Sequence, residues 1–116
     1  MLPKLVRDYI PQKIVKDGKV PVCEFLDDLN VEPYIFNKIK EEVAELQYEC
    51  TGPELSKERI LEEFADVFEI LMRLASSYGI TVRDINKARD KKLAKHGGFL
   101  NNIILTDIIF KGEEKK

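Results

Sequence analysis

The sequence of 116 residues has little of the sulfur and imidazole chemistry on which many sites depend. It contains one histidine and two cysteines, Cys23 and Cys50, which do not form a CxxC pair. One disulfide could join them, but the chain does not begin like a signal peptide, so we expect two reduced thiols in a cytoplasmic protein. No Ser, Thr or Cys stands in a recognisable nucleophile motif with a base partner, which gives no support for covalent catalysis.

A strong charge of one sign and long hydrophobic runs are also missing. Lys and Arg number 19 against 21 Asp and Glu, which gives a formal net charge of −2. No apolar run approaches the ~20 residues that span a bilayer. We therefore expect neither a polymeric nucleic-acid partner nor a membrane. The content of 44% hydrophobic and 34% charged residues is usual for a soluble globular protein, and the length predicts a single domain over residues 1–116.

Hydrophobic periodicity predicts a largely helical chain. We expect a short helix near 11–16 and longer helices over about 32–50, 57–78 and 81–95. Gly52 and Pro53 follow the end of the first long helix, and Gly79 follows the second. Ser56 is a candidate N-cap for the second helix.

The C-terminal region is ambiguous. Residues 99–110 contain two β-branched, aromatic-rich runs that could form short strands or a final helix. Residues 111–116 are a charged tail that we expect to be frayed. The overall prediction is an all-α helical bundle, with a short extended C-terminal segment as one option.

Two acidic motifs are the most informative feature of the sequence. Glu42 and Glu45 lie three residues apart on one predicted helix, and Glu63 and Asp66 lie three apart on the next. Residues at this spacing stand on the same face of a helix, one turn apart. Like charges placed in this way repel one another, so a shared cation is the obvious reason for the arrangement.

Helix geometry divides these acids by their position. At about 100° per residue, Glu42 and Glu63 fall inside or beside the apolar arcs, whereas Glu45 and Asp66 fall at the margins. Glu41 falls on the solvent side of its helix. An unpaired buried carboxylate costs several kcal/mol unless it is neutralised, paired or bound to a metal. The helix angles are compatible with two interpretations of the acids: a metal site, or a solvated acidic face paired with lysines.

The chemistry of the acids indicates which metal such a site would hold. All four ligands are hard oxygens with no His or Cys nearby in the sequence, which suits Mg²⁺ or Mn²⁺ rather than zinc. Mg²⁺ bound by carboxylates usually takes substrate phosphates as further ligands. Candidate positive partners for phosphate are Lys4, Arg7, Lys87, Lys91, Lys92 and Lys95. Each of these lysines could equally belong to an ordinary solvated face, and His96 could be a general base or a favourable helix-end charge.

Four motifs in order resemble a known family. They are Lys-Leu-Val-Arg-Asp-Tyr-Ile-Pro at 4–11, Glu-Glu-x-x-Glu at 41–45, Glu-x-x-Asp at 63–66 and Gly-Gly-Phe at 97–99. Together they resemble the all-α nucleoside triphosphate pyrophosphatases, the MazG-like proteins, and among these the small phosphoribosyl-ATP pyrophosphohydrolase-like branch. The resemblance spans about residues 4 to 105. In one departure, His96 stands where this branch would have Arg, and Lys95 could compensate for that charge.

The resemblance implies a fold, a site and a reaction. The fold would be a helical bundle in which a homodimer or homotetramer completes the site. Mg²⁺, or Mn²⁺ in its place, would be held by Glu42, Glu45, Glu63 and Asp66. The enzyme would hydrolyse a nucleoside triphosphate to the monophosphate and pyrophosphate, with Glu41 or Glu45 orienting or deprotonating the water. The residues that would balance the phosphate charge are Lys4, Arg7, Lys87, Lys92 and Lys95.

Three functions remain open at this stage. The first is a pyrophosphohydrolase that clears non-standard nucleotides. The second is a narrower enzyme that hydrolyses phosphoribosyl-ATP in histidine biosynthesis. The third is a non-catalytic helical module for nucleotide binding or dimerisation, in which the acids merely form salt bridges.

Overall fold

The computed structural model describes residues 2–112 and contains four helices. They are α1 (Ile10–Lys16), α2 (Asp28–Thr51), α3 (Lys57–Ser77) and α4 (Val82–His96). Residues 2–112 contain no β-strand, which confirms the all-α prediction. The chain divides into two compact units, Met1–Val82 and Arg83–Lys116. Within the described part, none of the helices combines the length and the apolar character that crossing a bilayer requires.

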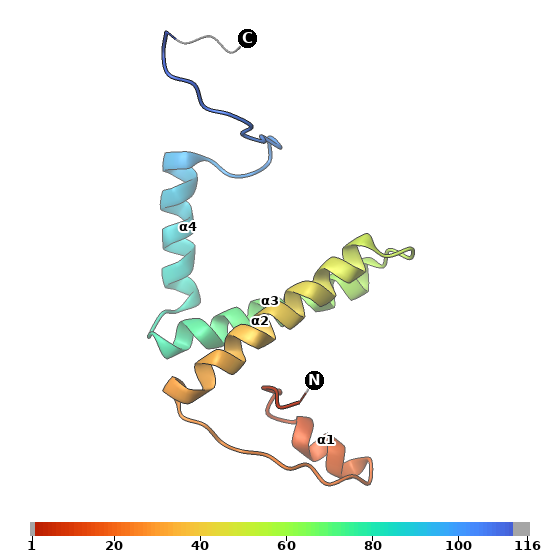
Figure 1. Cartoon of the computed structure of the whole chain (residues 1–116). Coiled ribbons are helices and arrows are strands. Elements are labelled where there is room, and N and C mark those ends of the chain that lie inside the picture. The colour runs from red at the N-terminus through yellow and green to blue at the C-terminus, as the bar shows by residue number, and fades with distance from the viewer. Residues whose placement is uncertain (1, 113–116) are drawn as a thin grey trace. The chain divides into compact units, whose positions relative to one another are not determined.

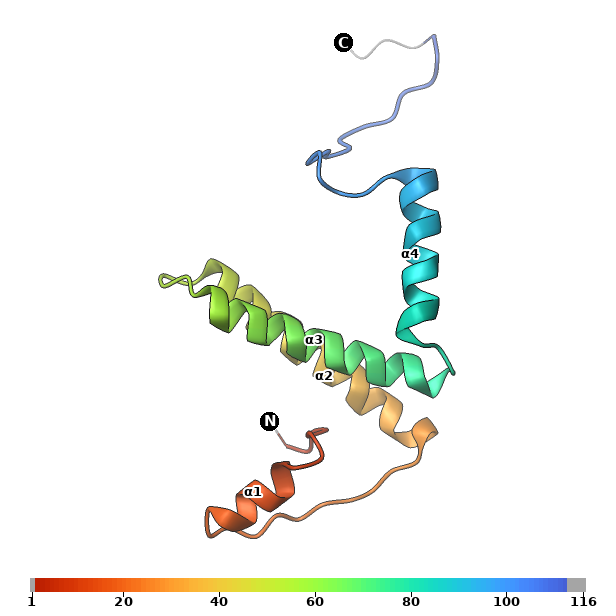
Figure 2. The same cartoon turned by 180° about the vertical axis from the view of Figure 1, so that it is seen from behind.

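The first unit is built on a hairpin of α2 and α3, which lie side by side in both views (Figures 1 and 2). The turn between them begins where the Thr51 hydroxyl donates a hydrogen bond to the Gln47 carbonyl at 2.8 Å. A Cβ atom on Gly52 would come within 3.0 Å of the Tyr48 carbonyl oxygen, so glycine permits the close approach of the turn. Ser56 then caps α3, as predicted, by accepting a hydrogen bond from the Arg59 N–H.

The start of α2 differs from the prediction. We expected the helix to begin near residue 32, where the helical repeat of apolar residues becomes clear. The helix instead begins at Asp28, and Pro33 lies inside it. The side chain of Asp27 accepts a hydrogen bond from the Asn30 N–H at 2.8 Å, and this N-cap explains the earlier start.

The C-terminus of α3 agrees with the prediction. Gly79 has a φ of +68°, which only glycine adopts without steric cost. The Gly79 N–H bonds to the Ser76 carbonyl and the Ile80 N–H bonds to the Ala75 carbonyl. This pair of bonds is a Schellman motif, and it satisfies carbonyl groups that the end of the helix leaves without partners.

The hydrophobic core of the first unit is small. Its buried members are Val31 and Ile35 of α2 and Ile70 of α3. Leu5, which precedes α1, packs against this cluster together with other partly buried side chains. The N-terminal segment is therefore held against the hairpin, which places its charged residues near the acidic faces of α2 and α3.

The open end of the hairpin is joined by polar contacts. The Arg73 guanidinium contacts the Asp28 carboxylate at 2.9 Å. The Tyr78 hydroxyl donates a hydrogen bond to Glu32, and the proximity of that carboxylate raises the pKa of Tyr78. These contacts join the start of α2 to the end of α3.

The second unit contains most of α4 and the segment that follows it. Residues 99–110 form neither strand nor helix, so the expectation of short strands or a final helix is wrong. A strand requires a neighbouring strand to pair its backbone groups, and the described part of the chain offers none. The side chains of this segment are exposed. Of the tail predicted to be frayed, residues 113–116 lie outside the described residues.

The cysteines behave as expected. Cys23 and Cys50 are both free thiols and both are exposed. No disulfide therefore links the segment before α2 to the end of that helix.

Candidate metal centre

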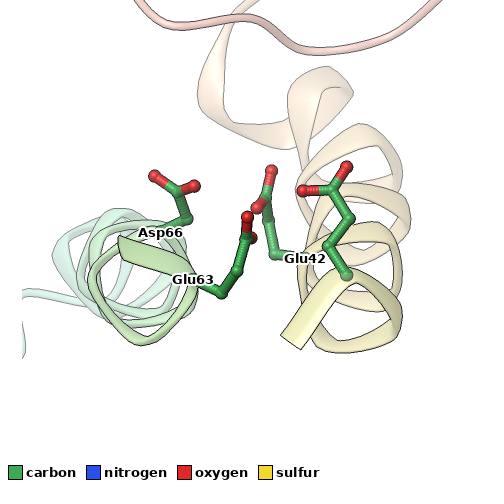
Figure 3. A group of neighbouring side chains, drawn as sticks. Glu42, Glu63 and Asp66 are labelled. Carbon is green, nitrogen blue, oxygen red and sulfur yellow. The ribbon is translucent and has the colours of Figure 1, made fainter. Parts of the chain in front are cut away.

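Four carboxylates converge between α2 and α3. Glu42 and Glu45 come from α2, and Glu63 and Asp66 come from α3. Each offers one oxygen atom, and these four oxygens all lie within 4.8 Å of one another. Figure 3 shows the labelled carboxylates of Glu42 and Glu63 between the two helices and that of Asp66 above α3. The two acidic motifs of the sequence thus form one cluster that could bind a metal ion.

Burial is uneven across the cluster. Glu42 is buried, with 6% of its surface exposed, as its position in the apolar arc of α2 predicts. Glu63 and Asp66 are half-buried and Glu45 is exposed. Among the described residues, the Oε2 atoms of Glu42 and Glu63 are buried without a hydrogen-bond partner. A buried carboxylate oxygen without a partner is costly, so this site fits a bound cation.

The local electrostatics agree with a cation site. Burial, followed by the charges of Glu45 and Asp66, raises the pKa of Glu63 to about 7. Burial and the charge of Glu45 also raise the pKa of Glu42, although the Lys38 ammonium acts against this rise. The folded chain therefore holds a proton at Glu63 up to neutral pH, and a divalent cation would relieve the same repulsion.

This raised pKa predicts a pH-dependent stability for the metal-free protein. The Glu63 carboxyl ionises near 4.5 in the unfolded chain and near 7 in the folded chain. Between these values the folded state binds more protons, so the free energy of unfolding should fall as the pH rises from 4.5 to 7. The raised pKa of Glu42 acts in the same direction.

Chemical denaturation in the presence of a chelator, at several pH values in this range, measures the effect. Glu63→Gln removes the ionisable group and should flatten the fall, whereas the exposed Glu62→Gln should leave it unchanged. A free energy of unfolding that rises between pH 4.5 and 7 in the wild type would contradict the prediction.

Two of the predicted phosphate-binding residues lie beside the acids. The Arg7 guanidinium pairs with the Asp66 carboxylate. The Lys4 ammonium lies 3.7 Å from Oε1 of Glu41. The structure therefore brings the N-terminal motif and the acidic motifs together, although they are separated by tens of residues in the sequence.

Lys38 is a residue that the sequence analysis missed. Its Nζ atom lies 3.3 Å from an oxygen of Glu41 and 3.3 Å from Oε1 of Glu42. Burial alone would lower the pKa of Lys38, but the hydrogen bonds and charges of Glu41 and Glu42 raise it. The signal was available, because Lys38 precedes Glu42 by four residues and therefore shares its helix face.

Glu41 requires a correction. Ideal helix angles place it on the solvent side, but the structure shows a half-buried side chain in contact with two lysines. Burial alone would raise the pKa of Glu41. The pKa is nevertheless lowered, by the hydrogen bond and charge of Lys38 and by the charge of Lys4. The angular argument failed here because it ignored the N-terminal segment that lies against α2. Glu62 and Glu69, on the polar face of α3, are exposed.

The remaining basic candidates lie on α4. Lys87, Lys92 and Lys95 are all exposed, as is His96 at the end of that helix. They belong to the second unit, whereas the acidic cluster belongs to the first. Their role in phosphate binding stays a prediction.

Comparison of the chain with protein-family models, with curated proteins and with solved structures found no match.

Proposed function

We propose that this protein is a Mg²⁺-dependent nucleoside triphosphate pyrophosphohydrolase. The observation that carries the proposal is the convergence of four carboxylates from α2 and α3, with two buried oxygens that lack partners. The order of the motifs at 4–11, 41–45, 63–66 and 97–99, which resembles the MazG-like proteins, supports the same function. The neighbouring Lys4 and Arg7 add the positive charge that a triphosphate requires.

The four acids would hold the cation in this proposal. Oxygen ligands without nitrogen or sulfur favour Mg²⁺, and Mn²⁺ would be accepted in its place. When bound, the ion supplies Lewis-acid polarisation of a phosphoryl oxygen and a template for the substrate. Glu42 and Glu63 provide the buried oxygens of the site, and Glu45 and Asp66 provide the more accessible ones.

The chain's own residues would also position the water. In the proposed reaction, water attacks the α-phosphorus, and a bond forms between the water oxygen and phosphorus. The bond to the α–β bridging oxygen breaks, and its electron pair leaves with pyrophosphate. The water proton passes to Glu41 or Glu45. Lys38 and Lys4 keep Glu41 ionised and in place, whereas Glu45 is exposed at the edge of the four-acid cluster.

A substrate screen with isotope labelling tests this function. The purified chain is incubated with standard and damaged nucleoside triphosphates in ¹⁸O-water, with and without Mg²⁺. We expect monophosphate and pyrophosphate as products, only with the ion, and the ¹⁸O label in the monophosphate. Release of a diphosphate and inorganic phosphate would contradict the proposed bond cleavage, and label in pyrophosphate would contradict attack on the α-phosphorus.

The same screen separates the alternatives. Pyrophosphate release from phosphoribosyl-ATP alone would favour the narrower enzyme of histidine biosynthesis. Tight binding of a non-hydrolysable triphosphate without turnover of any substrate would favour a binding module. The absence of both Mg²⁺ binding and turnover would favour a module in which the acids only form salt bridges.

We also propose that the chain forms a homodimer or homotetramer. Four large apolar side chains of α3 occur at helical spacing and remain substantially exposed: Leu61, Phe64, Phe68 and Leu71. A contiguous exposed apolar strip of this kind is typical of a protein–protein interface. The resemblance to proteins whose oligomers complete the site supports a second copy of the chain as the partner.

Phe68→Glu tests this self-association. The side chain is 54% exposed, so the substitution should be tolerated by the fold but should place a charge in the interface. We expect the molar mass measured by light scattering to fall from that of an oligomer to that of the monomer. Glu69→Gln, on the polar face, is the matched control and should keep the oligomer. A monomeric wild type at about 100 µM would contradict the proposal, because interfaces of ordinary size bind far more tightly.

A further inference from the structure

A cavity lies between the N-terminal segment and α2, and Lys38 on its wall contacts Glu42 of the acidic cluster. Its volume is about 520 Å³, within the range of small-molecule sites. Residues 2–5 form one wall, and the other wall is formed by α2 residues that include Tyr34, Asn37, Lys38 and Glu41. Glu41 thus lines the cavity, and the next residue, Glu42, belongs to the metal centre.

Two ammonium groups line this cavity. Lys38 is held by Glu41 and Glu42, each at 3.3 Å, and its side chain is only 17% exposed. Lys4 lies on the opposite wall, 3.7 Å from Glu41. An ammonium has three N–H donors, so two suffice for the contacts of Lys38 with the acids and the third is available to a ligand. The side chain is fixed before any ligand arrives, which lowers the entropic cost of binding.

Glu42 connects the cavity to the metal centre. Its Oε1 atom contacts Lys38, whereas its Oε2 atom is buried without a partner among the described residues. One oxygen of Glu42 therefore contacts the Lys38 ammonium on the cavity wall, and the other belongs to the space between α2 and α3. A phosphate ligand of an ion in that space would come close to the Lys38 ammonium.

We propose that this cavity binds phosphate groups of the metal-bound ligand and that Lys38 is their principal protein contact, with Lys4 as the second. The inference rests on the proposed function, because the metal centre brings the phosphates to Glu42. The phosphates could belong to the leaving pyrophosphate or to the nucleoside monophosphate that remains. Both present the same oxygen chemistry to an ammonium group.

Binding of the two products to the full chain tests the proposal. Titration calorimetry measures the affinity for Mn²⁺ alone, and then for inorganic pyrophosphate and for AMP in the presence of Mg²⁺. Lys38→Met removes the charge with little change in length, and Lys40→Met, at an exposed position of the same helix, is the matched control. Lys38→Met should weaken one or both phosphate ligands by roughly tenfold or more, as loss of a charged hydrogen bond predicts.

The affinity for Mn²⁺ should change in the opposite direction. Lys38→Met removes a positive charge beside Glu42, so Mn²⁺ should bind as well as in the wild type or more tightly. A purely structural lysine would instead lower both affinities or neither. Lys40→Met should leave all affinities within about twofold of the wild type. The ligand that loses more affinity identifies which phosphates occupy the cavity.

A measurement on the wild type covers the case in which Lys38→Met does not fold. Lysine acetylation, mapped by mass spectrometry, is compared with and without pyrophosphate and Mg²⁺. We expect protection of Lys4 and Lys38 but not of Lys40, and equal protection of all three would overturn the inference. The inference would also be overturned if the wild type binds Mn²⁺ and Lys38→Met leaves both phosphate affinities unchanged. Failure of the wild type to bind Mn²⁺ would instead remove the proposed function.

Discussion

Glu63→Gln should abolish turnover while the fold is kept. The substitution leaves the shape of the side chain but removes a half-buried carboxylate that could bind the ion in the four-acid cluster. The Lewis-acid contribution of a bound ion is several kcal/mol, so we expect the rate to fall by roughly a thousandfold or more. Release of pyrophosphate from the best substrate of the screen measures the rate, and circular dichroism measures the helix content.

The matched control for this substitution is Glu62→Gln. Glu62 is the preceding residue on α3 and is exposed on the polar face. The control should keep the wild-type rate within about twofold, because exposed charges outside a site contribute little. A Glu63→Gln variant that retains most of any wild-type turnover would show that the cluster is not catalytic.

Divalent cations should stabilise the wild type strongly and Glu42→Gln hardly at all. An ion that binds only the folded state adds about 2.7 kcal/mol at a concentration one hundred times its dissociation constant. Glu42 contributes a buried oxygen without a partner, so its loss should remove most of this gain. Thermal unfolding with chelator and with Mn²⁺ measures the difference in Tm.

The same variant should behave differently without metal. Burial, followed by the charge of Glu45, raises the pKa of Glu42, so the ionised form is less favourable in the metal-free fold than in the unfolded chain. Glu42→Gln should therefore match or exceed the wild type in stability when a chelator is present. A variant that is less stable with chelator and still gains the full Mn²⁺ effect would contradict the role assigned to Glu42.

The helices and the acidic cluster could be predicted from the sequence because both depend on local rules. Ser56 and Gly79 mark the ends of α3 through N-cap and Schellman hydrogen bonds. The spacing of Glu42, Glu45, Glu63 and Asp66 places each pair on one helix face. When α2 and α3 pack side by side, the two faces meet and the four oxygens come together.

Features that depend on contacts between distant segments were missed or wrong. The contact of Lys4 with Glu41 and the approach of Leu5 to the core depend on the path of the N-terminal segment, which periodicity does not specify. The environment of Glu41 was wrong for that reason. Residues 99–110 have high β-propensity, but propensity without a partner strand does not make a strand.

The apolar arcs illustrate a different limit. At about 100° per residue, Phe36 of α2 and Phe64 of α3 fall within the apolar arcs, yet both side chains are about half exposed. A single neighbouring helix covers only part of a wide apolar arc, so α2 and α3 cannot bury all of it between themselves. Periodicity therefore identified the apolar faces but not which part of each face is covered within one chain.

The proposed metal centre is tested most directly by a crystal structure of the protein with Mn²⁺, using the anomalous signal of the ion. We expect a peak between α2 and α3, with oxygens of Glu42, Glu45, Glu63 and Asp66 at coordination distance, about 2.0–2.1 Å if the geometry is that of Mg²⁺. The proposed metal centre would be contradicted if no anomalous peak appeared at saturating Mn²⁺ and the acids were contacted only by Arg7 and Lys38.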